Sequence, residues 1–99
     1  MLTVQEITNK LTPVFEANDV RIAILFGSYA KGTPTESSDI DLVVETANRL
    51  EGWDALGVKV DIEDALPIPA DVFHQFELVP NGPLDKEVKE TGRVIYARE

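Results

Sequence analysis

The 99-residue chain contains no cysteine, one histidine and one tryptophan, and its longest uninterrupted apolar run is the five residues from Ile22 to Phe26. Without cysteine the chain forms neither a disulfide nor a thiolate metal site, a composition that fits a reducing cytoplasm. A membrane-spanning helix needs about 20 apolar residues, so no membrane span is expected. No basic segment followed by an apolar one opens the sequence, and we therefore predict no secretory signal and a cytoplasmic location.

Basic residues are also scarce, since 9 Lys and Arg stand against 18 Asp and Glu and give a formal net charge of -9. The excess lies between residues 36 and 77, where eleven acids face only Arg49 and Lys59. Such a segment repels a phosphate backbone, so nucleic acid is not an expected partner. It is typical of a solvated acidic surface, and it also suits a cation or a basic protein partner.

The apolar pattern predicts one small α/β (α+β) domain over residues 1–99. Helices are expected over residues 4–17, 50–66 and 84–91, and strands over residues 20–26, 40–45, 70–78 and 94–97. Gly92 is expected to end the last helix as a left-handed cap. This order of elements indicates a small mixed β-sheet flanked by helices.

Two carboxylates, Asp39 and Asp41, occupy alternate positions at the start of the second expected strand. Side chains at alternate strand positions lie on one face, about 7 Å apart at their roots, so both carboxylates can reach one cation. Mg²⁺ suits this arrangement because it prefers oxygen ligands and often binds through one or two carboxylates plus phosphates. Taken alone, the pair is weak evidence of a metal site and is more typical of acids on the solvent side of a strand.

A Gly-Ser pair, Gly27 and Ser28, follows the first expected strand directly. Such a turn lets backbone N–H groups approach a phosphate, although an ordinary strand-ending turn has the same composition. It is not a P-loop, because Thr33 stands where that motif requires lysine and Lys31 precedes the second glycine.

Together, Gly27-Ser28, ten intervening residues and Asp39-x-Asp41 resemble the nucleotidyltransferase superfamily with its DNA-polymerase-β-like fold. The similarity is greatest to its minimal nucleotidyltransferase (MNT) group. It runs through nearly the whole chain, including the segments LFGSYAKG, SDIDLVVE, ADVFH and ETGRVIY. The resemblance adds Asp71 as a third carboxylate, placed on a later strand.

The resemblance implies a metal-dependent enzyme that transfers a nucleoside monophosphate, AMP from ATP, to an acceptor hydroxyl. Asp39, Asp41 and Asp71 would be its catalytic and metal-binding residues, with two Mg²⁺ ions expected and Mn²⁺ as the alternative. Gly27 and Ser28 would hold the phosphates. Lys31 would be a further nucleotide-binding residue, although it stands where many relatives carry arginine and lacks that residue's bidentate fork.

The same resemblance implies a protein partner. MNT proteins pair with HEPN ribonuclease toxins as toxin–antitoxin systems, and they neutralise the toxin by binding it and by adding AMP to a toxin tyrosine. We therefore expect an enzyme that serves as an antitoxin. Two alternatives stay open: an antitoxin that acts by contact alone, and a small-molecule nucleotidyltransferase that works as a homodimer or with a separate substrate-binding subunit.

Three further features are given structural interpretations. His74 is expected to be a structural or surface histidine and not a catalytic one. Trp53 is expected to pack near a helix start. The acids Asp61, Glu63 and Asp64 are expected on a solvated helix face.

Overall fold

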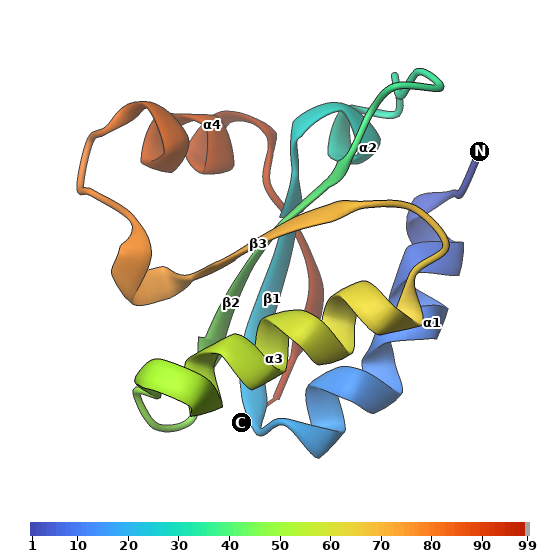
Figure 1. Cartoon of the computed structure of the whole chain (residues 1–99). Coiled ribbons are helices and arrows are strands. Elements are labelled where there is room, and N and C mark those ends of the chain that lie inside the picture. The colour runs from blue at the N-terminus through green and yellow to red at the C-terminus, as the bar shows by residue number, and fades with distance from the viewer. Residues whose placement is uncertain (99) are drawn as a thin grey trace.

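The computed structural model describes residues 1–98, in which four α-helices and one four-stranded sheet are formed (Figure 1). The elements are α1 (Val4–Ala17), β1 (Val20–Phe26), α2 (Gly27–Lys31), β2 (Ile40–Thr46), α3 (Gly52–Ala65), β3 (Ala70–His74), the 3-10 turn η1 (Gln75–Glu77), α4 (Pro83–Thr91) and β4 (Arg93–Ala97). The strand order is β3-β2-β1-β4, with β1 antiparallel to both β2 and β4 and with β2 parallel to β3. The predicted mixed sheet flanked by helices is confirmed.

Helix α1 begins where the sequence predicts, because a capping box closes its first turn. The Glu6 N–H donates to Thr3 Oγ1 at 3.1 Å, and the Thr3 N–H donates to Glu6 Oε1 at 3.0 Å. These two bonds satisfy amides that have no partner inside the helix. The apolar residues Ile7, Leu11 and Phe15 then follow at helical spacing and are fully buried against the sheet.

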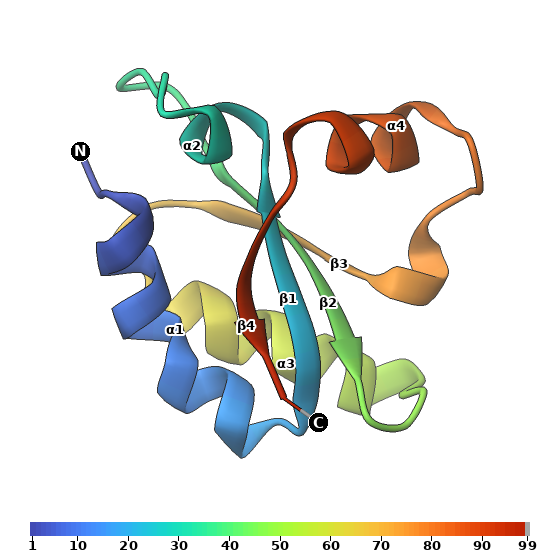
Figure 2. The same cartoon turned by 180° about the vertical axis from the view of Figure 1, so that it is seen from behind.

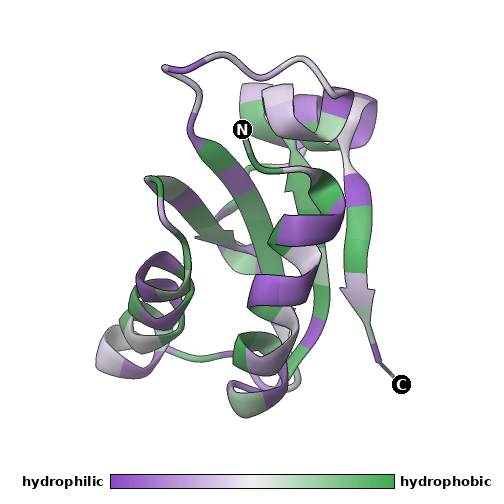
Figure 3. Cartoon of the chain, turned by 90° about the vertical axis from the view of Figure 1, so that its right-hand side faces the viewer, coloured by the Kyte–Doolittle hydropathy of each residue, from purple (hydrophilic) through white to green (hydrophobic). Residues whose placement is uncertain are grey.

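One face of the sheet carries the hydrophobic core. Helices α1 and α3 lie across that face (Figure 1), and α3 contributes Val58 and Ile62 to the core. From β2 the alternate residues Ile40, Leu42 and Val44 point into it. Seen from behind, strands β4, β1 and β2 lie in front of α3, so neither long helix covers this second face (Figure 2). The strands are mostly apolar, whereas the helices alternate apolar and polar bands (Figure 3).

His74 is structural, as predicted. Its side chain is 1 % exposed, and Nε2 lies 2.8 Å from the Ala55 carbonyl oxygen, which ties the end of β3 to α3. The acids Asp61, Glu63 and Asp64 are exposed on α3, which also agrees with the prediction. Among residues 1–98, no helix has both the length and the apolar character that a bilayer crossing demands.

The prediction of a strand over residues 70–78 is wrong in its second half. Strand β3 ends at His74, and the chain turns into η1. The turn is closed by Glu77, whose Oε2 accepts a hydrogen bond from the His74 N–H at 2.6 Å, and by Leu78, whose N–H donates to the Gln75 carbonyl at 3.2 Å. These local bonds replace the ladder bonds that a longer strand would have made.

The prediction that Trp53 packs into the structure is also wrong, because its side chain is 85 % exposed. Helix α3 places Val58 against the sheet. At 3.6 residues per turn, Trp53 lies about 140° around the helix from Val58 and therefore on its outer side. Apolar residues occur on both sides of α3, so the sequence pattern did not decide which side is buried.

Gly92 does not form the predicted left-handed cap, since its backbone is extended at φ -61° and ψ 137°. The site requires glycine for another reason. A Cβ at this position would collide with the Val88 carbonyl oxygen and would lie 2.9 Å from Ile24 Cγ2. The end of α4 therefore approaches β1 more closely than any side chain allows.

Replacing Gly92 with alanine is expected to lower the free energy of unfolding by about 1–3 kcal/mol, because the added methyl group overpacks the contact. Gly57 is the matched control: it lies inside α3, and a Cβ there meets nothing within 4 Å. Gly57→Ala is expected to raise the free energy of unfolding by up to about 1 kcal/mol through helix propensity. Urea unfolding of both variants measures the two changes, and equal effects would contradict the assignment.

Candidate active site

The predicted site residues lie at one end of the sheet. Strand β1 ends there, the other three strands begin there, and the helices α2 and α4 lie beside each other at that end (Figure 1). This end of the sheet is therefore flanked by α2 and α4.

Asp41 and Asp71 come together through the parallel pairing of β2 with β3, in which they are directly opposite partners. Neighbouring strands lie about 4.8 Å apart, so the two carboxylates stand side by side. Their strand neighbours Ile40, Leu42 and Val72 face the core, and alternation places both aspartates on the opposite face. Asp41 is half-buried and Asp71 is exposed.

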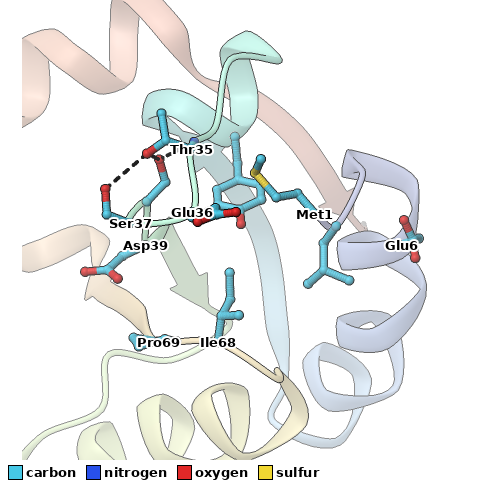
Figure 4. Close-up of a pocket in the computed structure, with 11 residues that line it drawn as sticks. Met1, Glu6, Thr35, Glu36, Ser37, Asp39, Ile68 and Pro69 are labelled. Atoms are coloured by element: carbon cyan, nitrogen blue, oxygen red, sulfur yellow. Dashed lines mark hydrogen bonds between the residues drawn. The ribbon is translucent and has the colours of Figure 1, made fainter.

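Asp39 lies two residues before Asp41, just ahead of β2, and is exposed. It stands at the edge of a hollow of about 680 Å³ between the start of α1 and the loop before β2. The carboxylate of Asp39 points away from Met1 and Ile68, which line the other side of that hollow (Figure 4). The hollow is thus separate from the pair Asp41 and Asp71.

Helix α2 begins at Gly27, directly after β1, and this start brings the Gly-Ser turn against Asp41. Phe26, the last residue of β1, is the ladder partner of Asp41. Gly27 has φ +76°, a conformation that L side chains rarely adopt, and a Cβ there would lie 2.5 Å from Asp41 Oδ2. Glycine at this position therefore lets the backbone approach the carboxylate.

Two other residues of the motif, Tyr29 and Lys31, differ in their surroundings. Lys31 is the last residue of α2 and is exposed. Tyr29 is only 4 % exposed and belongs to the core cluster. The structure thus brings Gly27 against Asp41, the ladder partner of Asp71, whereas Lys31 is at the far end of the short helix.

One residue that the sequence analysis missed, Glu87 of α4, also faces this site. Its Oε1 lies 3.6 Å from where a Gly27 Cβ would be. Burial raises the pKa of Asp41 to about 6, and the charges of Asp71, Glu87 and Asp39 add to that shift. Glu87 belongs to a helix of alternating charges, and nothing in its sequence neighbourhood distinguished it from a solvated residue.

The carboxylates surround the site without forming a closed metal cage. Within residues 1–98, no three carboxylate or imidazole groups converge closely enough to hold one ion by themselves. Mg²⁺ usually takes one or two protein carboxylates and completes its shell with water and substrate phosphates. The carboxylates of the ladder partners Asp41 and Asp71 fit that mode of binding, because a cation would offset the negative charges that add to burial in raising the Asp41 pKa.

The amino-acid sequence of this chain matches a known protein family. The profile of the family described as polymerase beta, nucleotidyltransferase, matches residues 9–99. The chain belongs to this nucleotidyltransferase family. It is also 34 % identical over 72 residues, or 73 % of this chain and 77 % of the relative, to a protein of Methanocaldococcus jannaschii named "putative protein adenylyltransferase". The expected enzyme class is thereby confirmed.

Solved structures of similar fold include toxin–antitoxin complexes. One, a toxin–antitoxin complex with AMP-PNP, superposes with a TM-score of 0.76 at 24 % identity, covering 93 % of this chain and 74 % of the other. Another, a tri-AMPylated Shewanella oneidensis HEPN toxin with its MNT antitoxin, gives a TM-score of 0.72 at 21 % identity, covering 97 % and 74 %. The expected nucleotidyltransferase fold is confirmed by these likenesses.

Replacing Asp41 with asparagine is expected to stabilise the metal-free protein at pH 7.5. The raised pKa means that the folded state disfavours the charged carboxylate, so stability falls as pH rises from about 4 toward the folded pKa of about 6. Asparagine keeps the shape and removes that charge. Melting temperatures measured in EDTA should be higher for the variant at pH 7.5.

The same difference should nearly vanish at pH 3.5, where Asp41 is mostly protonated in both states of the wild-type protein. Asp64→Asn on the exposed face of α3 is the control and should show no such dependence on pH. An Asp41→Asn variant less stable than wild type at pH 7.5 would contradict the electrostatic account.

Proposed function

We propose that this nucleotidyltransferase transfers AMP from ATP to a hydroxyl group of a partner protein, and that residues 1–99 act as one minimal nucleotidyltransferase domain. The observation that carries the proposal is the juxtaposition of Asp41 with Asp71 in the parallel ladder, next to the close Gly27 turn. Transfer to a hydroxyl needs charge stabilisation at a phosphate and a group that takes the hydroxyl proton. Both requirements can be met at this end of the sheet.

In the proposed site, Gly27 and Ser28 bind the β- and γ-phosphates, and Lys31 adds a positive charge at the end of α2. The Gly27 backbone lies close enough to Asp41 for one ligand to contact both. Asp71 stands beside Asp41 in the ladder and helps to remove the proton from the acceptor hydroxyl. Attack of that hydroxyl on the α-phosphate releases pyrophosphate.

Asp39, Asp41 and Asp71 are proposed to hold divalent cations, two Mg²⁺ ions or Mn²⁺. Bound there, the cations would offset the negative charge of the phosphate oxygens and of the carboxylates. Two properties of the chain support this assignment. The three aspartates offer oxygen ligands, which Mg²⁺ prefers. Burial raises the pKa of Asp41, the negative charges of Asp71, Glu87 and Asp39 add to that shift, and a cation would offset those charges.

The proposed partner is a HEPN-type toxin, and the proposed acceptor is a tyrosine of that toxin. Support comes from the relatives: one is named a protein adenylyltransferase, and the structures of similar fold include an MNT antitoxin with an AMPylated HEPN toxin. The net charge of -9 is compatible with binding a basic surface of a protein.

The proposal is tested by AMP transfer from α-labelled ATP to a purified HEPN protein that binds this chain, with Mg²⁺ or Mn²⁺ present. Wild-type protein is expected to label the partner at a tyrosine. Asp39→Ala and Asp41→Ala are each expected to lower the rate at least about a hundredfold, because charge stabilisation worth several kcal/mol is lost. The labelled residue is identified by mass spectrometry.

Asp64→Ala is the matched control, since it removes one exposed carboxylate of α3 and leaves the site unchanged. It should transfer AMP at the wild-type rate. Binding of the partner with no transfer by wild-type protein under either metal would replace the enzymatic proposal with neutralisation by contact. Labelling of a small molecule in place of the protein would reassign the acceptor.

A further inference from the structure

Thr91, the last residue of α4, is hydrogen-bonded to Gly27, the first residue of α2. The Gly27 N–H donates a hydrogen bond to Thr91 Oγ1 at 2.9 Å, across 64 positions of sequence. The Thr91 hydroxyl in turn donates a hydrogen bond to the Glu87 carbonyl oxygen at 2.9 Å. The hydroxyl therefore accepts one bond and donates one, and its orientation is determined by both.

This contact replaces a helix cap that α2 lacks. Amides in the first turn of a helix have no acceptor inside the helix and need one from elsewhere. Phe26 occupies the cap position of α2 and provides no side-chain hydrogen bond. Gly27 is buried, so its amide relies on Thr91 as the acceptor.

Thr91 is itself held in place by the packing of α4 on β1. The Gly92 N–H donates to the Val88 carbonyl at 2.8 Å, and a Cβ at Gly92 would lie 2.9 Å from Ile24 Cγ2. Strand β4 starts one residue later and pairs Arg93 with Leu25 of β1. The hydroxyl is thus fixed relative to the strand that leads into the Gly27 turn.

The position of Gly27 sets the distance between the turn and the carboxylate behind it. The clearance is small, since a Cβ on Gly27 would lie 2.5 Å from Asp41 Oδ2. If the Thr91 hydroxyl is removed, the buried amide must move toward another acceptor or stay unpaired, and either change disturbs the turn. A displacement of Gly27 would change the distance between the turn and the Asp41 carboxylate, and with it the space for a bound triphosphate.

We infer that Thr91 is a positioning residue: through Gly27 it holds the nucleotide-binding turn at the distance from Asp41 that ATP requires. The inference rests on the proposed function, because it assigns the Gly27 turn to the triphosphate. Thr91 acts through the backbone and makes no contact with the reacting atoms. The C-terminal helix of the fold thereby becomes part of the site.

Thr91→Val is the decisive variant, because valine keeps the branched shape and removes only the hydroxyl. We expect its ATP dissociation constant and KM to rise about tenfold, the size expected when a buried donor loses its partner. The effect on kcat should be smaller. Thr91→Ser restores the hydroxyl and is expected to stay within about twofold of wild type, as one retained hydrogen bond predicts.

Thr12→Val is the matched control. Thr12 Oγ1 donates to the Thr8 carbonyl at 2.7 Å, the same side-chain bond to the preceding turn of a helix, but on α1. Its loss should leave ATP affinity unchanged. If Thr91→Val lowers the melting temperature as Thr12→Val does and leaves ATP affinity at the wild-type value, the role of Thr91 is purely structural and the inference is overturned.

Amide hydrogen exchange provides a measurement on the wild-type protein that does not depend on how a variant folds. The Gly27 N–H should be protected without nucleotide, to the same degree as neighbouring β1 amides. Rapid exchange of that amide would overturn the inference. Wild-type protein that binds no ATP while Gly27 is protected would overturn the proposed function and with it this role, so the two failures are distinguishable.

Discussion

The parallel pairing of β2 with β3 brings the two central carboxylates together, and much of the fold serves to make that pairing. Parallel neighbours cannot be joined by a tight turn, so the chain leaves β2 at Thr46, crosses the core face through α3 and returns at Ala70. The register matters as much as the pairing. A slip of one residue would turn Asp71 into the core and bring an apolar side chain beside Asp41.

The packed core makes this arrangement of like charges tolerable. The carboxylates of Asp41 and Asp71 repel each other, and Glu87 adds a third negative charge from α4. They stay together because their backbones belong to a sheet whose opposite face is buried under α1 and α3. Functional sites commonly carry such unfavourable interactions at the expense of stability.

Sequence reasoning was reliable where the local pattern and the tertiary structure agree. The capping box of Thr3 and Glu6 predicted the start of α1, and the apolar run before Gly27 predicted β1 from end to end. It was wrong in the second half of the strand predicted over residues 70–78, and also at Trp53 and at Gly92. The errors at Trp53 and Gly92 have one cause: the exposed side of α3 and the close contact of α4 with β1 depend on what packs nearby, which no local pattern records.

The sequence by itself determined the class of the protein, because the Gly-Ser pair and the two aspartates lie within one short segment, residues 27–41. Local spacing was enough to place Asp41 on a strand with Asp39 just ahead of it, and to predict the elements around them. Only the tertiary structure decided that Asp71 stands opposite Asp41, that Glu87 faces the same site and that Thr91 caps Gly27. These contacts join residues 30 to 64 positions apart. Such distances are bridged by sheet register and helix packing, which arise when the whole core forms.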